Sequence, residues 1–452
     1  MATSLGFAAR VVLIVAAIFC GLWLAFAVFS YQQYLHGWEN VVLLYAIPAV
    51  VLMFLLVSLE ESSVFMIAVS SSLILATFAA YAFEAVEDYN RFLGEPARIS
   101  AAERIGVDFD TSTRHEIVRK LRQDGFDAYP PINPAALIAA SFKMYVDNDE
   151  VLPFGGISNK TVVACNESGR WISYSTDEHG FNNPLGIWAS KGLDIAIVGD
   201  SFLNGWCVDP ANDIASQLRS MYPATLNLAN SGNGPLVELA SIKEFLEPFQ
   251  PRFVLWFYFE GNDLNDLVFH EQDNAILMQY VTSDFRQQLV AKQPDIDKKL
   301  SEFTNTQLAL YDDKSPDPFR SYLRYVLKLT DLRSRIGLTS TRLTESESVL
   351  TSFARVLDEA KEYVERWDGE LIFVYLPMWE RYAKPQYANI HREKVLELVQ
   401  NHHISLIDLH PTFMEQPDPL SLFPLRLFGH YNELGQEIVA TAVLNAIESE
   451  KQ

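Results

Sequence analysis

Cysteine is scarce in this sequence of 452 residues, which contains only Cys20, Cys165 and Cys207. There is no Cys-x-x-Cys pair and no Cys/His cluster with metal-ligand spacing, so we expect no metal and no cofactor. Basic residues are also in deficit, with 35 Lys and Arg against 57 Asp and Glu and a net charge of −22. Because nucleic-acid surfaces need clustered cations to neutralise phosphates, we expect no nucleic-acid partner.

Charge is almost absent from three apolar runs near the N-terminus, Val11–Ser30, Val41–Leu59 and Val64–Phe83. Each is long enough to cross a hydrocarbon layer of roughly 30 Å. We therefore predict three transmembrane helices that form a membrane anchor over residues 1–90. The short connection Glu60–Ser63 makes the second and third helices a hairpin.

The flanks of these runs favour one orientation. Arg10 is the only Lys or Arg before the first run, and the loop Tyr31–Asn40 contains none. The positive-inside rule then places the N-terminus inside and, after three crossings, the C-terminal part outside the cytoplasm. The alternative is that so slight a bias sets no orientation and the C-terminal part faces inward.

The remainder divides into a linker over residues 91–150, with a helical segment at Thr113–Gln123, and a domain over 151–452. A β-hairpin is predicted around the turn Asn166–Gly169. Apolar runs that suit buried strands then alternate with helical patterns, which predicts an α/β fold with a doubly wound parallel sheet. The predicted strands are 193–198, 225–228, 253–259, 371–376 and 404–409. A polar, largely helical insertion interrupts the alternation at about 264–348.

Polar motifs follow the ends of these strands. Gly199-Asp200-Ser201 follows the first, Asn230-Ser231-Gly232-Asn233-Gly234 the second, and Glu260-Gly261-Asn262-Asp263 the third, while His430-Tyr431-Asn432 lies near the C-terminus. At these residues the sequence resembles the SGNH (GDSL-type) hydrolase superfamily, whose serine, glycine, asparagine and histidine blocks occur in this order. The resemblance covers about the last two thirds of the chain and implies a flavodoxin-like three-layer fold.

The resemblance implies a role for each block. Ser201 is the expected nucleophile and His430 the base that takes its proton. The expected oxyanion donors are the backbone N–H groups of Ser201 and Gly232 and the side-chain amide of Asn262. His179 and His270 remain minor alternatives for the base, and the adjacent Asp177, Glu178 and His179 fit a loop better than a metal site.

One part of the family pattern is missing. The family usually places an Asp two or three residues before the histidine to orient its ring, but Phe428 and Leu427 stand there. Asp408, Glu433 or a backbone carbonyl are the candidate replacements, and the alternative is a weakened or inactive site. Cys165 and Cys207 are a possible disulfide if the domain lies outside the cytoplasm.

These observations predict a membrane-anchored serine esterase or O-acyltransferase, similar to bacterial inner-membrane members of the superfamily. Its substrate would be an acyl ester, an O-acetyl group on an extracytoplasmic glycan, cleaved through an acyl-enzyme on Ser201. A transferase would also need a membrane partner that supplies the acyl group. The alternatives are an inactive glycan-binding or scaffold protein, and a lipase or phospholipase acting near the bilayer.

Overall fold

The computed structural model describes most of the chain. The described residues are 2–29, 45–92, 94–313, 329, 332, 347–384 and 391–449. The chain folds as two compact units. One unit combines Met1–Leu93 with Pro316–Ser340, and the other combines Gly94–Ser315 with Thr341–Gln452.

Two helices of the first unit, α1 (Ala2–Phe29) and α5 (Ser63–Phe92), are long and apolar enough to cross a membrane. The middle helix, α4 (Ile47–Ser58), has 12 residues. At about 1.5 Å per residue it spans about 18 Å, short of the roughly 30 Å that hydrocarbon requires. The prediction of three spanning helices is therefore wrong for the described residues, and residues 41–44 of the second apolar run lie outside them.

The helices of the first unit pack through a small apolar cluster. Ala9, Leu13 and Ala17 of α1 contact Leu55 of α4 and Met66 of α5. Only 17% of the apolar window of α1 and 11% of that of α5 are buried. A core helix of a soluble protein would be mostly buried, so the exposed apolar faces suit a lipid environment better than a protein core.

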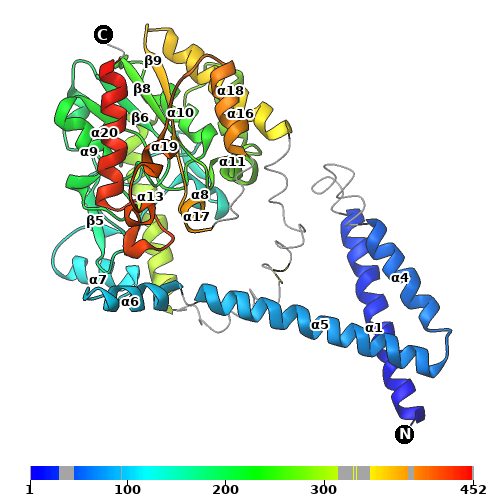
Figure 1. Cartoon of the computed structure of the whole chain (residues 1–452). Helices are drawn as coiled ribbons and strands as arrows, with labels where there is room; N and C mark the ends of the chain where they lie inside the picture. Colours follow the sequence, from blue (N-terminus) through cyan, green and yellow to red (C-terminus); the bar gives the residue numbers. More distant parts are fainter. Residues whose placement is uncertain are drawn as a thin grey trace. The chain divides into compact units, whose positions relative to one another are not determined.

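The second unit is built on a five-stranded parallel sheet with the strand order β10-β9-β8-β6-β7. Figure 1 labels β6, β8 and β9 of this sheet. The strands are β6 (Ile195–Val198), β7 (Thr225–Asn227), β8 (Phe253–Phe259), β9 (Glu370–Leu376) and β10 (Ser405–Asp408). These are the strands that the apolar runs predict. Because all five are parallel, their carboxyl ends lie along one edge of the sheet.

Alternate residues of each strand face opposite layers of helices. Ala196 and Trp256 face a cluster that includes α10, α16 and α18, whereas Ile197 and Leu255 face one that includes α9, α19 and α20. The helices of these layers are α9 (Ile214–Met221), α10 (Pro235–Phe245), α16 (Glu347–Glu365), α18 (His391–Asn401), α19 (Leu409–Met414) and α20 (Glu433–Ser449). Covering on both faces explains the continuous apolar runs, and the predicted α/β fold with a parallel sheet is confirmed.

A smaller sheet contains the predicted hairpin. Strands β4 (Thr161–Cys165) and β5 (Ile172–Ser175) pair antiparallel, and β1 (Ala128–Tyr129) joins β4 in parallel. The turn between β4 and β5 contains Glu167.

Residues 94–150, expected as a linker, belong to the folded second unit. Their elements are α6 (Gly94–Arg104), α7 (Arg114–Gln123), β1, α8 (Pro134–Ala139), β2 (Met144–Val146) and β3 (Asp149–Val151). Val118 and Leu137 are each 1% exposed. The segment therefore contributes its own apolar side chains to the core and is not a free tether.

The described part of the insertion after β8 is helical, as predicted. Its elements are α11 (Asp263–Asp266), η4 (Leu267–Glu271), α12 (Ala275–Thr282) and α13 (Leu289–Asp313). Short helical turns complete the unit: η2 (Ile187–Ala189), η3 (Pro210–Asn212), α17 (Glu380–Ala383), η6 (Pro419–Leu422) and η7 (Pro424–Arg426).

Candidate active site

Ser201 lies in the turn that ends β6. Asp200 shapes this turn, because its side chain accepts a hydrogen bond from the Phe202 N–H at 2.9 Å. A Cβ on Gly199 would lie 3.3 Å from both Leu203 and Phe257, so a small residue lets the chain turn tightly against β8. The half-buried Ser201 is thus delivered at the carboxyl edge of the sheet, where α/β folds bind their ligands.

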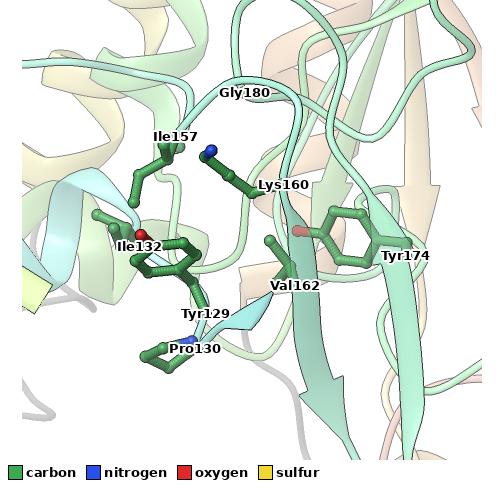
Figure 2. Close-up of a pocket in the computed structure, with 9 residues that line it drawn as sticks. Tyr129, Pro130, Ile132, Ile157, Lys160, Val162, Tyr174 and Gly180 are labelled. Atoms are coloured by element: carbon green, nitrogen blue, oxygen red, sulfur yellow. The ribbon is translucent and has the colours of Figure 1, made fainter. Parts of the chain in front are cut away.

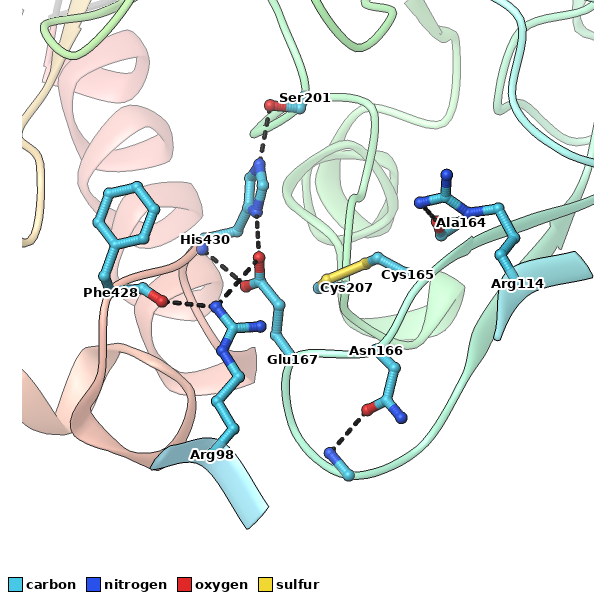
Figure 3. The surroundings of a disulfide bond; sticks show 11 residues. Arg98, Arg114, Ala164, Cys165, Asn166, Glu167, Ser201, Cys207, Phe428 and His430 are labelled. Carbon is cyan, nitrogen blue, oxygen red and sulfur yellow. Dashed lines mark hydrogen bonds and ion pairs between the residues drawn. A yellow bond between two sulfur atoms is a disulfide. The ribbon is translucent and has the colours of Figure 1, made fainter. Parts of the chain in front are cut away.

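His430 lies against this serine. Its Nε2 is 2.8 Å from the Ser201 Oγ, although the two residues are 229 positions apart in the chain (Figure 3). The ring of Phe202 packs against the imidazole with centroids 4.7 Å apart. The predicted nucleophile and base are therefore within hydrogen-bonding distance, which proton transfer between them requires.

Glu167 is the carboxylate that orients His430. Its Oε1 lies 3.0 Å from Nδ1, and its Oε2 accepts the backbone N–H of the same histidine at 2.8 Å. An Nδ1–H that donates to Glu167 leaves Nε2 free to accept the hydroxyl hydrogen of Ser201. Burial raises the pKa of Glu167, but His430 and Arg98 outweigh it, and the pKa lies below its usual value.

The two acids considered from the sequence have other partners. Asp408 pairs with Arg392 and accepts the backbone N–H of His410 at 3.1 Å, which caps α19. Glu433 lies 3.3 Å from Arg170. Asp408 and Glu433 are therefore incorrect predictions for the orienting acid.

The alternative bases also lie elsewhere. His179 packs edge-on against Trp188 with centroids 4.4 Å apart, and His270 lies 3.8 Å from Asp266. The buried Asp177 accepts hydrogen bonds from Trp188 Nε1 and Asn183 Nδ2 and from two backbone N–H groups. These contacts support the interpretation of this segment as a structured loop.

A disulfide between Cys165 and Cys207, with Cα atoms 5.3 Å apart, brings Glu167 to the site. Cys165 ends β4, two residues before Glu167, and Cys207 lies six residues after Ser201. The sequence contained a feature from which Glu167 could have been predicted. A disulfide from the hairpin to the nucleophile segment would place the one carboxylate of the Asn166–Gly169 turn beside the site.

Glu167, Cys207 and His430 are also the one group among the described residues whose ligand atoms are close enough to hold a metal ion, within 4.8 Å of one another. Cys207 Sγ is part of the disulfide and cannot act as a thiolate ligand. The geometry fits acid–base chemistry better than metal binding.

The expected oxyanion donors follow three adjacent strands, β7, β6 and β8. Among the described residues, no protein acceptor contacts the backbone N–H of Ser201 or of Gly232. Gly199 O accepts hydrogen bonds from the Asn230 N–H and from Asn233 Nδ2, both at 3.3 Å, which holds the glycine loop against the nucleophile turn. Gly232 has φ +74°, a conformation that favours glycine.

Asn262 begins α11 and is held by that helix. Its Nδ2 donates to Asp266 Oδ2 at 2.7 Å, which leaves the second amide hydrogen for another acceptor. Burial raises the pKa of Asp200, while Asn262 and Ser201 lie close enough to its carboxylate to oppose that shift. Asn262 therefore lies near the nucleophile turn, as the resemblance implies.

A group of buried acids lies beside these donors: Asp200, Glu238, Asp263, Asp266 and Glu271. Burial and the neighbouring carboxylates raise the pKa of Asp266 to about 8. Burial raises that of Glu271 to about 7, even though the carboxylate accepts N–H groups from the start of α10. Glu238 is fully buried, and neither of its carboxylate oxygens has a hydrogen-bond partner.

A separate small pocket lies beside the hairpin (Figure 2). Its volume of about 10 Å³ has room for about one water molecule. Lys160, the charged residue in its lining, is paired with Asp127. No member of the Ser201 site lines this pocket.

The order of serine, glycine, asparagine and histidine along the chain, and the contact of the serine with the histidine, now appear together in one structure. The arrangement has the order and the serine–histidine contact that the resemblance to SGNH hydrolases implies. The orienting acid of this site comes from a hairpin 263 residues before His430.

No protein-family model and no curated protein sequence matches the chain. Solved structures to which parts of the chain are similar include a two-domain esterase active on acetylated mannans, 11% identical over 58% of this chain and 50% of that one, with a TM-score of 0.32. They also include a lipase/acylhydrolase from Enterococcus faecalis, 12% identical over 57% and 97%, with a TM-score of 0.32. The esterase EstA from Pseudoalteromonas sp. is 11% identical over 56% and 96%, with a TM-score of 0.28. At similarities this low, any function of the Ser201 site must be argued from its own geometry.

Proposed function

We propose that this chain is a membrane-anchored serine esterase or O-acyltransferase that acts on acyl esters of an extracytoplasmic glycan. The observation that carries the proposal is the continuous set of contacts from Ser201 through His430 to Glu167, with distances of 2.8 and 3.0 Å. A hydroxyl, an imidazole and a carboxylate in this order form a nucleophile, a base and an orienting acid.

The first half of the reaction forms an acyl-enzyme. Ser201 Oγ attacks the ester carbonyl carbon as its proton passes to His430 Nε2, and Glu167 stabilises the imidazolium that results. The N–H groups of Ser201 and Gly232 and the Asn262 amide donate to the oxyanion. When the tetrahedral intermediate collapses, the C–O bond to the alcohol breaks and His430 protonates the departing alkoxide.

The second half decides between hydrolysis and transfer. Water or a sugar hydroxyl attacks the acyl carbon, His430 takes its proton, and the Ser201 Oγ leaves and is protonated. Water yields a free carboxylic acid, whereas a sugar hydroxyl yields a new ester. A transferase would also require a membrane partner that supplies the acyl group.

A pair of aromatic rings near the site supports a glycan substrate. Phe428 lies two residues before His430 and is 57% exposed, and its ring meets that of Trp379 edge-to-face at 6.3 Å. The Tyr431 hydroxyl donates to Pro377 O at 2.5 Å, which ties the Trp379 segment to the histidine loop. Exposed aromatic rings offer apolar faces on which sugar rings stack.

The disulfide and the apolar helices support the proposed location. Disulfides persist in oxidising compartments, so the bond from Cys165 to Cys207 favours a catalytic unit outside the cytoplasm. Together with α1 and α5, it supports a multi-pass protein of a bacterial inner membrane. Two crossings then put the N-terminus on the same outer side as the catalytic unit, opposite to the orientation that Arg10 favours. A reporter fused to the C-terminus and active only outside the cytoplasm tests this orientation, and cytoplasmic signal contradicts it.

Hydrolysis of p-nitrophenyl acetate tests the proposed chemistry. We expect Ser201→Ala and His430→Ala to lower kcat by about 10³-fold or more, while His402→Ala, at a half-buried histidine paired with Asp358, retains it. Unchanged turnover in both site variants would overturn the proposal. Absence of fluorophosphonate labelling with retained glycan binding would favour a scaffold, and a preference for long acyl chains would favour a lipase.

A further inference from the structure

Arg98 reaches the proposed active site from the segment that directly follows the last apolar helix in the chain. It lies on α6, and its Nη2 donates to the backbone carbonyl of Phe428 at 2.6 Å, across 330 positions of sequence. The same nitrogen lies 3.8 Å from Glu167 Oε1. Arg98 therefore contacts both the carboxylate that orients His430 and the loop that carries this histidine (Figure 3).

Gly429 leaves room for this contact. A Cβ at this position would lie 2.5 Å from Glu167 Oε2 and 3.3 Å from Arg98 Nη2. The carboxylate and the guanidinium thus lie directly over the backbone of the residue before His430. From this position Arg98 Nη2 reaches both Phe428 O and Glu167.

Because the Glu167 carboxylate is largely buried, a neighbouring cation stabilises its ionised form. The Glu167 side chain is 11% exposed and that of Arg98 is 21% exposed, so water screens the pair only partly. The charged or titratable groups that face Glu167 in the described part of the chain are Arg98 on α6 and His430. Without Arg98 the buried carboxylate would lose a partner that keeps it ionised and aligned.

We propose that Arg98 is a positioning residue that holds Glu167 toward His430 Nδ1 and fixes the Phe428–His430 loop, so that α6 completes the active site. This inference rests on the proposed esterase function. It also means that the catalytic unit begins with α6, where the chain leaves the anchor, and not after a linker ending near residue 150.

The test uses the full-length protein in detergent with p-nitrophenyl acetate as substrate. We expect Arg98→Gln to lower kcat by about tenfold or more with little change in KM, because the hydrogen bond from the guanidinium to the Phe428 carbonyl and the positive charge beside Glu167 are both lost. Arg98→Lys restores part of the rate. Arg104→Gln is the matched control, since Arg104 lies on the same helix and donates to Ser100 O.

The pH profile separates positioning from a general loss of folding. Arg98 lowers the pKa of Glu167, so its removal lets this carboxylate protonate at higher pH. We therefore expect the acid limb of kcat/KM to move to higher pH in Arg98→Gln, and not in Arg104→Gln. A wild-type rate and an unmoved limb would overturn the role of Arg98.

A double-mutant cycle keeps the inference testable if Arg98→Gln is less stable. Because Arg98 acts through Glu167 as well as through the Phe428 carbonyl, its replacement should cost less activity in the Glu167→Gln background than in the wild type. Equal costs in both backgrounds would contradict the inference. If Ser201→Ala and His430→Ala kept full activity, the esterase proposal itself would fail, and that outcome is distinct from a failure confined to Arg98.

Discussion

At His430, both ring nitrogens have partners that come from distant parts of the chain. Ser201 follows a strand of the main sheet, and Glu167 lies in the turn of a separate hairpin. The carboxylate needs only the correct distance and direction to select the reactive tautomer, so its place in the sequence is free to vary. The absence of an Asp before His430 therefore does not imply an inactive site.

The first prediction concerns Glu167. Glu167→Gln should lower kcat by about 10³-fold or more, because the amide can donate to Nδ1 and favour the wrong tautomer. KM should change little, since Glu167 does not contact the proposed substrate position. Assays with p-nitrophenyl acetate check this, and Asp408→Asn and Glu433→Gln serve as controls. If either control variant lost more activity than Glu167→Gln, that residue and not Glu167 would be the acid that orients His430.

Gly429 yields a second prediction at the residue scale. Its missing side chain makes room for the end of a flexible Glu167 side chain, so Gly429→Ala should displace the carboxylate and leave the fold intact. A shift of about 1 Å in such a group can cost about 10²-fold in rate. We expect that loss in kcat with an unchanged melting temperature. Gly192→Ala, where no atom lies within 4 Å of the new Cβ, should retain full activity.

At the scale of elements, the β4–β5 hairpin depends on one covalent link to the main sheet. The disulfide joins the end of β4 to the segment after Ser201, and the two cysteines are 42 positions apart in the chain. By restricting the unfolded chain, such a link stabilises a fold by about 2–4 kcal/mol. Because Glu167 lies beside it, the link also fixes the position of the acid.

Loss of this disulfide should therefore affect both stability and rate. The double variant Cys165→Ala/Cys207→Ala should unfold at lower urea concentration, and its kcat should fall as the hairpin loosens. Cys20→Ser, at the remaining free cysteine, is the control and should behave like the wild type. A reductant that leaves the wild-type rate unchanged would show that packing alone holds the hairpin.

At the scale of the whole molecule, the chain is rich in acidic residues, and several of them are buried beside the Ser201 site. Burial and neighbouring carboxylates raise the pKa of Glu238 and Asp263 well above their ordinary values, and that of Asp266 to about 8. An acid with a raised folded-state pKa binds its proton more tightly in the folded protein. Its stabilising effect is complete below the unfolded pKa and is lost as the pH rises through the folded value.

We therefore expect the free energy of unfolding to fall between pH 5 and pH 9. Each unit of pKa shift corresponds to about 1.4 kcal/mol, so the fall should be measurable by urea denaturation followed by tryptophan fluorescence. Glu238→Gln removes one buried acid and should reduce the fall, whereas the exposed Glu302→Gln should not. An identical pH dependence in Glu238→Gln would show that Glu238 does not titrate in this range.

The sequence alone determined the sheet and the blocks at its edge. Short apolar runs specify buried parallel strands, and parallel strands deliver whatever follows their carboxyl ends to the same edge. Ser201, the Gly232 loop and Asn262 could be anticipated for that reason. The strongly apolar composition of α1 and α5 likewise identified them as long apolar helices without any tertiary information.

Only the tertiary structure decided the acid, the extent of the catalytic unit and the number of long apolar helices. Glu167 and Arg98 act through the directions of side chains that approach His430 from α6 and the hairpin, and no local pattern encodes such directions. The same holds for residues 94–150, whose scattered apolar side chains show their role only when packed. Local periodicity specifies elements, whereas contacts between distant elements decide which charged groups meet.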